Sequence, residues 1–161
     1  MRRALVITVS TRAAAGVWDD RSGPVLRDGL EAMGLQVDGP LVVADGDPVE
    51  AALRDAVSQG YHLVATTGGT GLTPSDLTPE MTARVVEREI PGVAEAIRAA
   101  GVAKGVPTAI LSRGIAGQAG PTLVVNLPGS TGGVRDALEV LAAVIPHALD
   151  QIPGSDHPRS E

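Results

Sequence analysis

The sequence contains no cysteine and no phenylalanine, and Trp18 and Tyr61 are its only tryptophan and tyrosine. Without cysteine the chain has no disulfide, no thiolate metal site and no cysteine nucleophile, which is compatible with a reducing compartment. The core must therefore be built from Ala, Val, Leu and Ile. So few rings also argue against single-stranded nucleic acid as a ligand, because stacking platforms for bases need aromatic side chains.

Basic residues are scattered along the chain, and the net charge is −6. A nucleic-acid-binding protein usually has a basic stripe, so we expect no nucleic-acid partner. No apolar run approaches the roughly 18–20 residues that a membrane span needs. The run at 4–10 is also too short for a secretory signal. These absences lead us to expect a soluble, cytoplasmic protein without a membrane partner.

Apolar segments alternate along the 161 residues in a pattern typical of an α/β fold. The expected strands are 4–10, 35–44, 62–67, 107–112 and 122–126, and the expected helices are 23–33, 48–59, 78–89, 93–103 and 133–151. Alternating strands and helices indicate a mostly parallel sheet with helices on both faces. We expect one domain over residues 1–152, followed by a flexible tail over 153–161.

Several residues mark the ends of these helices. Thr78 before Pro79 is an expected N-cap, and either Asp45 or Asp47 could cap the helix from 48. Pro146 predicts a kink or a restart within the last helix.

Polar and glycine-rich clusters follow the predicted strands where each strand ends. In open α/β sheets the ligand crevice lies beyond the carboxyl ends of the strands, so these clusters should meet at one edge. Candidate binding residues at this edge come from the ends of four predicted strands. In strand order they are Ser10 and Arg12, then Thr67, then Ser112 and Arg113, and last Asn126.

The stretch TTGGTG (66–71) after the third strand is a candidate phosphate loop. Glycine lets backbone N–H groups approach an anion, and threonine hydroxyls add further donors. The stretch matches neither a Walker A loop nor a G-x-G-x-x-G fingerprint, and a plain strand-to-helix turn explains it about equally well. A second candidate is NLPGS (126–130), where Ser130 and the start of the last helix offer donors to an anion. Helix capping by Ser130 or Thr131 is the competing interpretation.

Asp76 and Asp45 are the candidate catalytic and metal-binding carboxylates at this edge. Mg²⁺ is typically bound through one or two carboxylates together with substrate phosphates, which suits two acids beside an anion site. The competing readings are a solvated Asp76 and a capping role for Asp45, although Asp47 suits that cap better. Arg12 and Arg113 could pair with anionic substrate groups, or form salt bridges to Asp19 or Asp20.

Other catalytic classes find little support in the sequence. The three histidines have no metal-like spacing, and no G-x-S-x-G elbow of a serine hydrolase is present.

Three motifs in order resemble the MogA/MoaB family of molybdenum cofactor biosynthesis. They are VSTRAAAG-x-x-DDRSG, TTGGTG-x₄-D-x-TPE and LSRGIAG-x-x-G-x-TLVVNLPGS, and the similarity runs from about Val6 to Ile152. The resemblance implies a three-layer α/β/α fold that assembles as a homotrimer. It also implies an enzyme that uses Mg²⁺ and ATP to adenylylate the terminal phosphate of molybdopterin, with release of pyrophosphate. A molybdate-inserting enzyme is a candidate partner.

The resemblance also assigns roles to individual positions. The essential loop acid falls on Asp76 and the acid after the second strand on Asp45, with Asp47 as the weaker match. One wall of the nucleotide and pterin-phosphate site would comprise Gly68, Gly69, Thr70 and Gly71, and the other wall Ser112, Pro128, Gly129 and Ser130. Many members have Asp where this chain has Thr11, which leaves the role of that position open.

Three alternatives remain at the level of the sequence. The chain could bind molybdopterin as a scaffold with little or no adenylyltransferase activity. It could be related to the molybdate-inserting enzymes, although these are much longer. It could also be a nucleotide-binding regulator that uses the TTGGTG loop for phosphate only. Pyrophosphate release in the presence of molybdopterin distinguishes the enzyme from the first and third of these.

Overall fold

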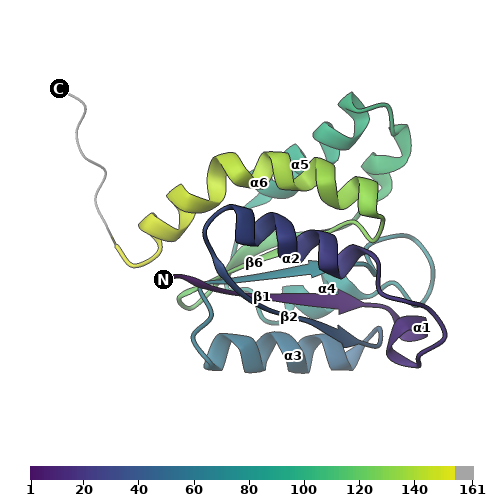
Figure 1. The fold of residues 1–161 in the computed structure, drawn as a ribbon, viewed down its shortest axis with the longest axis horizontal. Coiled ribbons are helices and arrows are strands. Elements are labelled where there is room, and N and C mark those ends of the chain that lie inside the picture. The colour runs from purple at the N-terminus through teal and green to yellow at the C-terminus, as the bar shows by residue number, and fades with distance from the viewer. Residues whose placement is uncertain (155–161) are drawn as a thin grey trace.

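The computed structural model describes residues 1–154, which form a six-stranded sheet covered by helices on both faces (Figure 1). The strands are β1 (Arg3–Val9), β2 (Gln36–Val43), β3 (Leu63–Thr67), β4 (Arg88–Glu89), β5 (Ala116–Ala119) and β6 (Thr122–Leu127). The helices are α1 (Thr11–Ala14), α2 (Ser22–Ala32), α3 (Asp47–Ser58), α4 (Thr78–Ala83), α5 (Pro91–Ala103), the 3₁₀ helix η1 (Pro107–Leu111) and α6 (Thr131–Gln151). The expected three-layer α/β/α class is confirmed.

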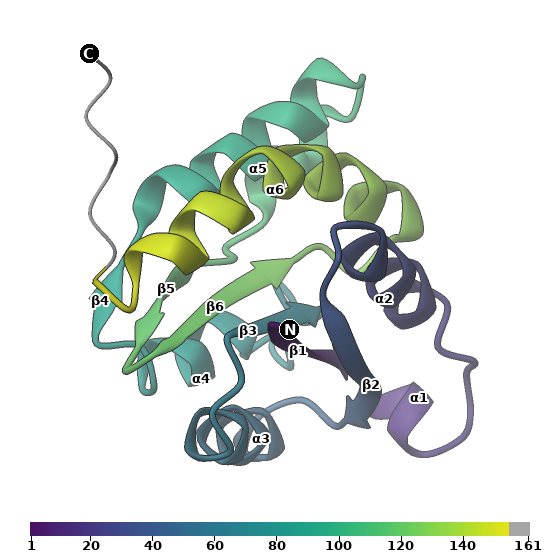
Figure 2. The same cartoon turned by 60° about the vertical axis from the view of Figure 1, so that its left-hand side comes forward.

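The strand order is β2-β1-β3-β6-β5-β4 (Figure 2). β2, β1, β3 and β6 are parallel neighbours, whereas β5 runs antiparallel to β6 and β4 antiparallel to β5. The chain leaves β1 toward β2 on one side, and β3 and β6 lie on the other side. The carboxyl ends of β1 and β3 therefore flank the point where the strand order reverses, which is where α/β sheets bind ligands.

Each face of the sheet has its own apolar core. Along β1, Ala4 and Val6 pack with side chains of α2 and α6, while Leu5 and Ile7 pack with side chains of α3. Successive residues of a strand point to opposite faces, so a strand covered on both faces must be apolar at every position. This accounts for the unbroken apolar run that the sequence shows there.

The expected strand at 107–112 is wrong, because Pro107–Leu111 forms the 3₁₀ helix η1 beside α5. Gly101 of α5 permits this packing, since a Cβ on it would lie 2.5 Å from Cβ of Ala109. The neighbouring strand β5 was missed because its sequence, AGQA, has low strand propensity. A Cβ on Gly117 would lie 2.2 Å from Val86, so close packing and not propensity selects this sequence.

The expected helix at 78–89 is also too long. α4 ends at Ala83, and Arg88–Glu89 form β4, which pairs with β5. Thr78 is not the N-cap, because its hydroxyl donates to the carbonyl oxygen of Gly68 at 3.0 Å. The sheet therefore uses residues that the sequence pattern alone assigns to a helix.

Of the other predicted helix caps, the one by Ser130 is confirmed and the one by Asp45 or Asp47 is wrong. Neither Asp45 nor Asp47 caps α3, whose N-cap is Gly46. Ser130 does cap α6, since its Oγ accepts a hydrogen bond from the backbone N–H of Gly133 at 3.0 Å. α6 continues through Pro146 and does not restart there.

Residues 155–161 of the expected tail lie outside the described residues. None of the helices within residues 1–154 is long and apolar enough to cross a membrane.

Candidate functional site

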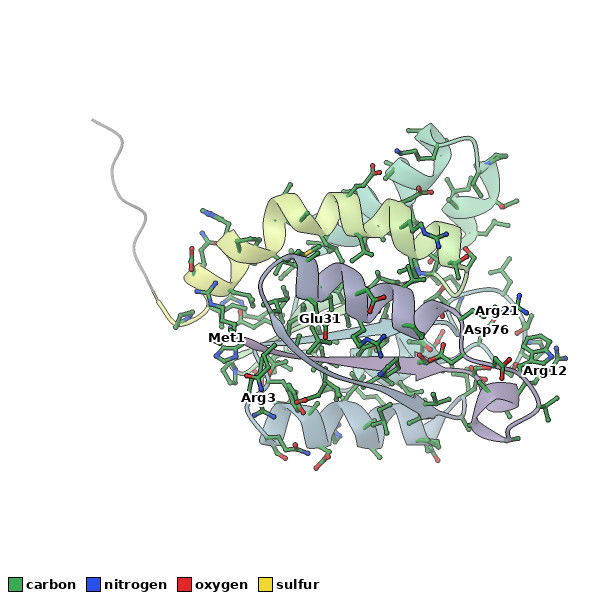
Figure 3. The ribbon with its side chains drawn as sticks, in the orientation of Figure 1. Met1, Arg3, Arg12, Arg21, Glu31 and Asp76 are labelled. Carbon is green, nitrogen blue, oxygen red and sulfur yellow. The ribbon has the colours of Figure 1, made fainter. Side chains whose placement is uncertain are left out.

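The carboxyl ends of the parallel strands bring the predicted polar loops to one end of the molecule. Arg12, Arg21 and Asp76 lie at this end, whereas Met1 and Arg3 lie at the opposite end (Figure 3). Strand direction alone explains this separation, because every parallel strand ends at the same edge.

The glycine loop after β3 is fixed by backbone conformations that other residues rarely adopt. Gly68 and Gly69 have φ of +99° and +67°. A Cβ on Gly68 would lie 2.3 Å from the carbonyl oxygen of Val9, and one on Gly69 would lie 2.3 Å from Oγ1 of Thr78. Glycine is therefore required here by the fold itself, in addition to any approach of a ligand.

Both candidate carboxylates border this loop. A Cβ on Gly69 would lie 3.0 Å from Oδ1 of Asp45, and a Cβ on Gly71 would lie 2.8 Å from Oδ2 of Asp76. The backbone N–H of Thr73 donates to Oδ2 of Asp76 at 3.2 Å. The two acids thus approach the same four-residue stretch from different segments of the chain.

Thr11, whose role the sequence left open, forms hydrogen bonds with Asp45. The Thr11 hydroxyl donates to Oδ2 of Asp45 at 2.7 Å, and the backbone N–H of Asp45 donates to the Thr11 hydroxyl oxygen at 3.2 Å. Thr11 begins the short helix α1, which Ser10 caps by accepting from Ala13 N–H at 3.1 Å. Thr11 therefore orients one candidate metal ligand.

Two clefts open on the two sides of the glycine loop. The first has a volume of about 630 Å³ and lies between the β1 end, the following loop and the β3 end. Its lining comprises Thr8, Val9, Ser10, Ala13, Val17, Trp18, Asp19, Asp20, Arg21, Ser22, Thr67, Gly68 and Gly129. Of the predicted binding residues it therefore contains Ser10, Thr67, Gly68 and Gly129.

The second cleft has a volume of about 750 Å³ and lies between the glycine loop, α5, η1 and the start of α6. Predicted residues in its lining are Gly69, Thr70, Gly71, Asp76, Ser112, Pro128, Gly129 and Ser130. Arg98, Lys104, Arg135 and Asp136 also line it, beside the N-terminus of the 21-residue helix α6. Lys104 pairs with Glu139 at 3.0 Å, and Arg98 donates to the carbonyl oxygens of Ser112 and Gly114. The positive groups of the cleft therefore include Arg135 and the helix N-terminus. This combination favours an anionic ligand.

Gly129 belongs to both clefts and marks their junction. A Cβ on Gly129 would lie 3.3 Å from Cα of Gly68, so the backbones of the two loops nearly touch. Thr67 strengthens this junction by donating from its hydroxyl to the carbonyl oxygen of Pro128 at 2.6 Å. Ligands bound in the two clefts would meet where the backbones of Gly68 and Gly129 approach each other.

Arg113 lines neither cleft and is engaged with the glycine loop instead. Its Nε donates to the carbonyl oxygen of Gly71 at 2.9 Å and its Nη2 to that of Asp76 at 2.7 Å. Its Nη1 pairs with the carboxylate of Glu80. The hydrogen bond from Arg113 lowers the pKa of Glu80 below its ordinary value, against the opposing effect of burial.

Asn126 and Arg12 also lie outside the lining of the clefts. Asn126 is 2% exposed and its amide is fully engaged, donating to the hydroxyls of Thr66 and Thr82 and accepting from Ile115 N–H. Arg12 lies over the ring of Trp18, with its Cζ 4.3 Å from the centroid. Within residues 1–154, neither Arg12 nor Arg113 forms the alternative salt bridge to Asp19 or Asp20.

Several cleft residues were not singled out from the sequence. Trp18 and Arg21 lie in the motif DDRSG and its preceding loop and received no role, and Asp20 was considered only as a salt-bridge partner of Arg12 or Arg113. Arg98 and Arg135 lie on α5 and α6, where charged residues at helical spacing look like a solvated face. Only the packing of α5 against α6 turns them toward a common cleft.

Of the two candidate magnesium ligands, Asp76 lines the second cleft and Asp45 lines neither cleft. Among residues 1–154, no group of three or more His, Cys, Asp or Glu could hold a metal by itself. Asp45 and Asp76 are two carboxylates beside one loop, and Mg²⁺ usually takes its other ligands from phosphates and water. These residues therefore do not form a metal centre in which the protein supplies all the ligands.

Fold and site together define a three-layer α/β ligand-binding domain with two joined clefts at the switch point of its sheet. The sequence matches the family described as "Probable molybdopterin binding domain" over residues 5–147, and the chain belongs to this family. This confirms the family that the three sequence motifs resemble.

Comparisons with individual proteins agree. The solved structure of the molybdopterin biosynthesis Mog protein from Mycobacterium ulcerans is 56% identical, with a TM-score of 0.90, covering 94% of this chain and 99% of that chain. A molybdopterin adenylyltransferase from Helicobacter pylori is 37% identical over 93% of this chain and 87% of its own length. A molybdenum cofactor biosynthesis bifunctional protein from Chlorobaculum tepidum is 40% identical over 96% of this chain. The chain spans about half the length of that bifunctional relative, 50%.

Proposed function

We propose that this chain is a molybdopterin adenylyltransferase, which transfers AMP from ATP to the terminal phosphate of molybdopterin and releases pyrophosphate. The observation that carries the proposal is the pair of clefts that share Gly129, with Asp76 lining the second cleft. Joining two phosphate groups requires two ligands whose phosphates meet at one point. The two clefts meet at Gly129, which supports such a meeting of phosphates. The relative from Helicobacter pylori is named molybdopterin adenylyltransferase.

The reaction needs no nucleophilic side chain. An oxygen of the molybdopterin phosphate attacks the α-phosphorus of ATP, a new P–O bond forms, and the bond to the leaving pyrophosphate breaks. Negative charge is conserved on phosphate oxygens throughout, so the protein mainly positions the two substrates and stabilises that charge. The absence of cysteine from the chain is no obstacle to this chemistry.

The charge-stabilising groups come from this chain's loops and helices. Gly132 and Gly133, in the first turn of α6, line the second cleft together with Arg135. Helix N-termini and guanidinium groups both stabilise phosphate oxygens. Arg113 acts indirectly in this scheme, because it holds the loop of Asp76 and does not line a cleft.

Asp76 and Asp45 would hold Mg²⁺, which when bound would neutralise negative charge on the phosphate oxygens. Thr11 keeps Asp45 in one orientation beside the glycine loop. The homotrimer and a molybdate-inserting enzyme as recipient of the product belong to the same proposal and follow from the family resemblance. The cytoplasmic location is also part of the proposal and follows from the composition of the sequence.

The proposal is tested by incubating the purified protein with molybdopterin, ATP and Mg²⁺. Adenylylated molybdopterin is measured by mass spectrometry and pyrophosphate by a coupled assay. We expect Asp76→Asn to lower the rate by at least about 100-fold, because a neutral amide is a poor magnesium ligand. Asp47→Asn is the matched control, since the Asp47 side chain is 95% exposed and should leave the rate within about twofold.

Two outcomes would contradict the proposal. No product from the wild-type protein, despite binding of molybdopterin, would favour the scaffold alternative. A rate for Asp76→Asn close to that of the wild type would remove the metal-binding role.

A further inference from the structure

Trp18 is the one large aromatic side chain that this protein places at its surface. The sequence has one Trp and one Tyr and no Phe. Tyr61 is buried, and its hydroxyl donates to Asp38 at 2.7 Å. Trp18, in contrast, is 57% exposed and lines the first cleft. An exposed indole beside a cleft offers apolar ring surface that a planar ligand in the cleft would cover.

Arg12 contacts both the backbone and the ring of the Trp18 segment. The backbone N–H groups of Val17 and Trp18 both donate to the carbonyl oxygen of Arg12, at 2.8 and 3.3 Å. The guanidinium of Arg12 lies over the indole, with Cζ 4.3 Å from the ring centroid. Trp18 lines the first cleft and Arg12 does not, so Arg12 supports the ring from outside. A ligand in the cleft therefore meets an indole that is already held in position.

The polar residues of the first cleft suit a ring that bears both N–H donors and nitrogen acceptors, because a carboxylate accepts hydrogen bonds and a guanidinium donates them. The carboxylate of Asp19 and the guanidinium of Arg21 line the cleft together with Trp18. Gly68 and Gly129 also line this cleft, and Gly129 lines the second cleft as well. One ligand in the first cleft could therefore contact both the indole and the glycine loops.

We propose that Trp18, backed by Arg12, is the stacking platform for an amino-substituted nitrogen heterocycle that carries a phosphate group. This inference rests on the proposed function for its two possible sources, the adenine of ATP and the pterin of molybdopterin. Both contain a planar pyrimidine ring that bears an exocyclic amino group, and both are attached to phosphate. Stacking on an aromatic ring accepts either, so the assignment between them is made by the experiment.

The test uses the fact that Trp18 is the only tryptophan, so tryptophan fluorescence reports on this ring alone. AMP and molybdopterin are titrated separately into the wild-type protein, with ribose 5-phosphate as the ring-free comparison for AMP. Affinities for wild type, Trp18→Phe and Trp18→Ala are measured by calorimetry. Val102→Ala is the control, because Val102 is an exposed apolar residue on α5 that lines neither cleft.

We expect AMP or molybdopterin to quench the fluorescence and ribose 5-phosphate to leave it unchanged. For the quenching ligand, Trp18→Ala should weaken binding by about tenfold, while Trp18→Phe stays within about threefold of the wild type. Whichever ligand shows this pattern is the source of the ring. The proposal is overturned if neither ligand quenches, or if Trp18→Ala binds both ligands as tightly as the wild type.

The same proteins are assayed for adenylyl transfer, which separates this inference from the proposed function. If the wild-type protein transfers AMP but Trp18→Ala binds both ligands normally, the stacking platform is wrong and the function stands. If the wild-type protein transfers no AMP but Trp18 is needed to bind a ring-bearing ligand, the stacking platform stands and the function is wrong.

Discussion

The Nη2 atom of Arg113 donates a hydrogen bond to the backbone carbonyl oxygen of Asp76 at 2.7 Å. The same guanidinium donates to the carbonyl oxygen of Gly71 at 2.9 Å, so one side chain spans both ends of the segment between these residues. The backbone N–H of Arg113 adds a third bond, to the carbonyl oxygen of Thr70 at 2.8 Å. Arg113 therefore sets where the carboxylate of Asp76 lies relative to the second cleft.

Arg113→Lys should impair catalysis more than folding. A lysine keeps the charge but cannot form the forked set of hydrogen bonds that holds the loop. We expect kcat for adenylyl transfer to fall by about 10- to 100-fold and the Mg²⁺ concentration for half-maximal activity to rise. Steady-state kinetics across a Mg²⁺ titration measures both quantities.

Arg54→Lys is the matched control for this substitution. Arg54 also donates to a backbone carbonyl oxygen, that of Arg84 at 3.0 Å, but it lies on α3 and lines neither cleft. We expect its kinetics to match the wild type. Unchanged kcat and Mg²⁺ dependence in Arg113→Lys would show that Arg113 does not position Asp76.

The ion pair between Glu80 and Arg113 should make stability depend on pH in acid. Because the hydrogen bond from Arg113 lowers the pKa of Glu80 in the folded state, the unfolded chain takes up the proton first as pH falls. The contribution to stability is present above the ordinary glutamate pKa of 4.5 and is lost as pH falls through the lowered value. Since the Glu80 side chain is 45% exposed, we expect no more than about 1 kcal/mol.

Urea unfolding of the wild type and Glu80→Gln at pH 7 and pH 3 measures this contribution. The wild type should be the more stable protein at pH 7, and the difference should shrink at pH 3. A difference of the same size at both pH values would mean that ionisation of Glu80 is not its source.

Asn126→Leu should lower stability. Leucine removes three hydrogen bonds inside the protein and leaves Ile115 N–H and the hydroxyls of Thr66 and Thr82 without this partner. We expect the free energy of unfolding to fall by about 3 kcal/mol, the range for breaking a buried hydrogen-bond network.

Gln118→Leu is the matched control for Asn126→Leu. The Gln118 amide lies in β5 and donates at the surface to the carbonyl oxygen of Gly120, so its loss should cost less than about 1 kcal/mol. Chemical denaturation compares the two variants. A loss of stability in Asn126→Leu no larger than in Gln118→Leu would contradict the structural role.

The sequence pattern correctly predicted those strands and helices whose structure is determined within a single segment of the chain. The apolar run of β1 predicts a strand buried on both faces, and its alternating residues do pack into two separate cores. Strand direction then places the loops after β1, β2, β3 and β6 at one edge, as expected. The sequence pattern predicted a strand at η1 and no strand at β5. Both predictions are wrong because close packing at Gly101 and Gly117 overrides the strand propensity of the residues.

By itself the sequence determined the fold class, the family, and the edge of the sheet at which the glycine loop, Asp45 and Asp76 gather. The family follows from the resemblance of the three motifs. The fold class and the edge follow from periodicity, glycine placement and strand direction, all of which act over short distances along the chain. Only the tertiary structure decided what the polar side chains do. Arg113 turns to the loop and not to a cleft, Asn126 is buried, and Trp18 faces the first cleft. Each of these outcomes depends on partners that are distant in sequence, and side-chain hydrogen bonds and packing form only once the fold has brought those partners together.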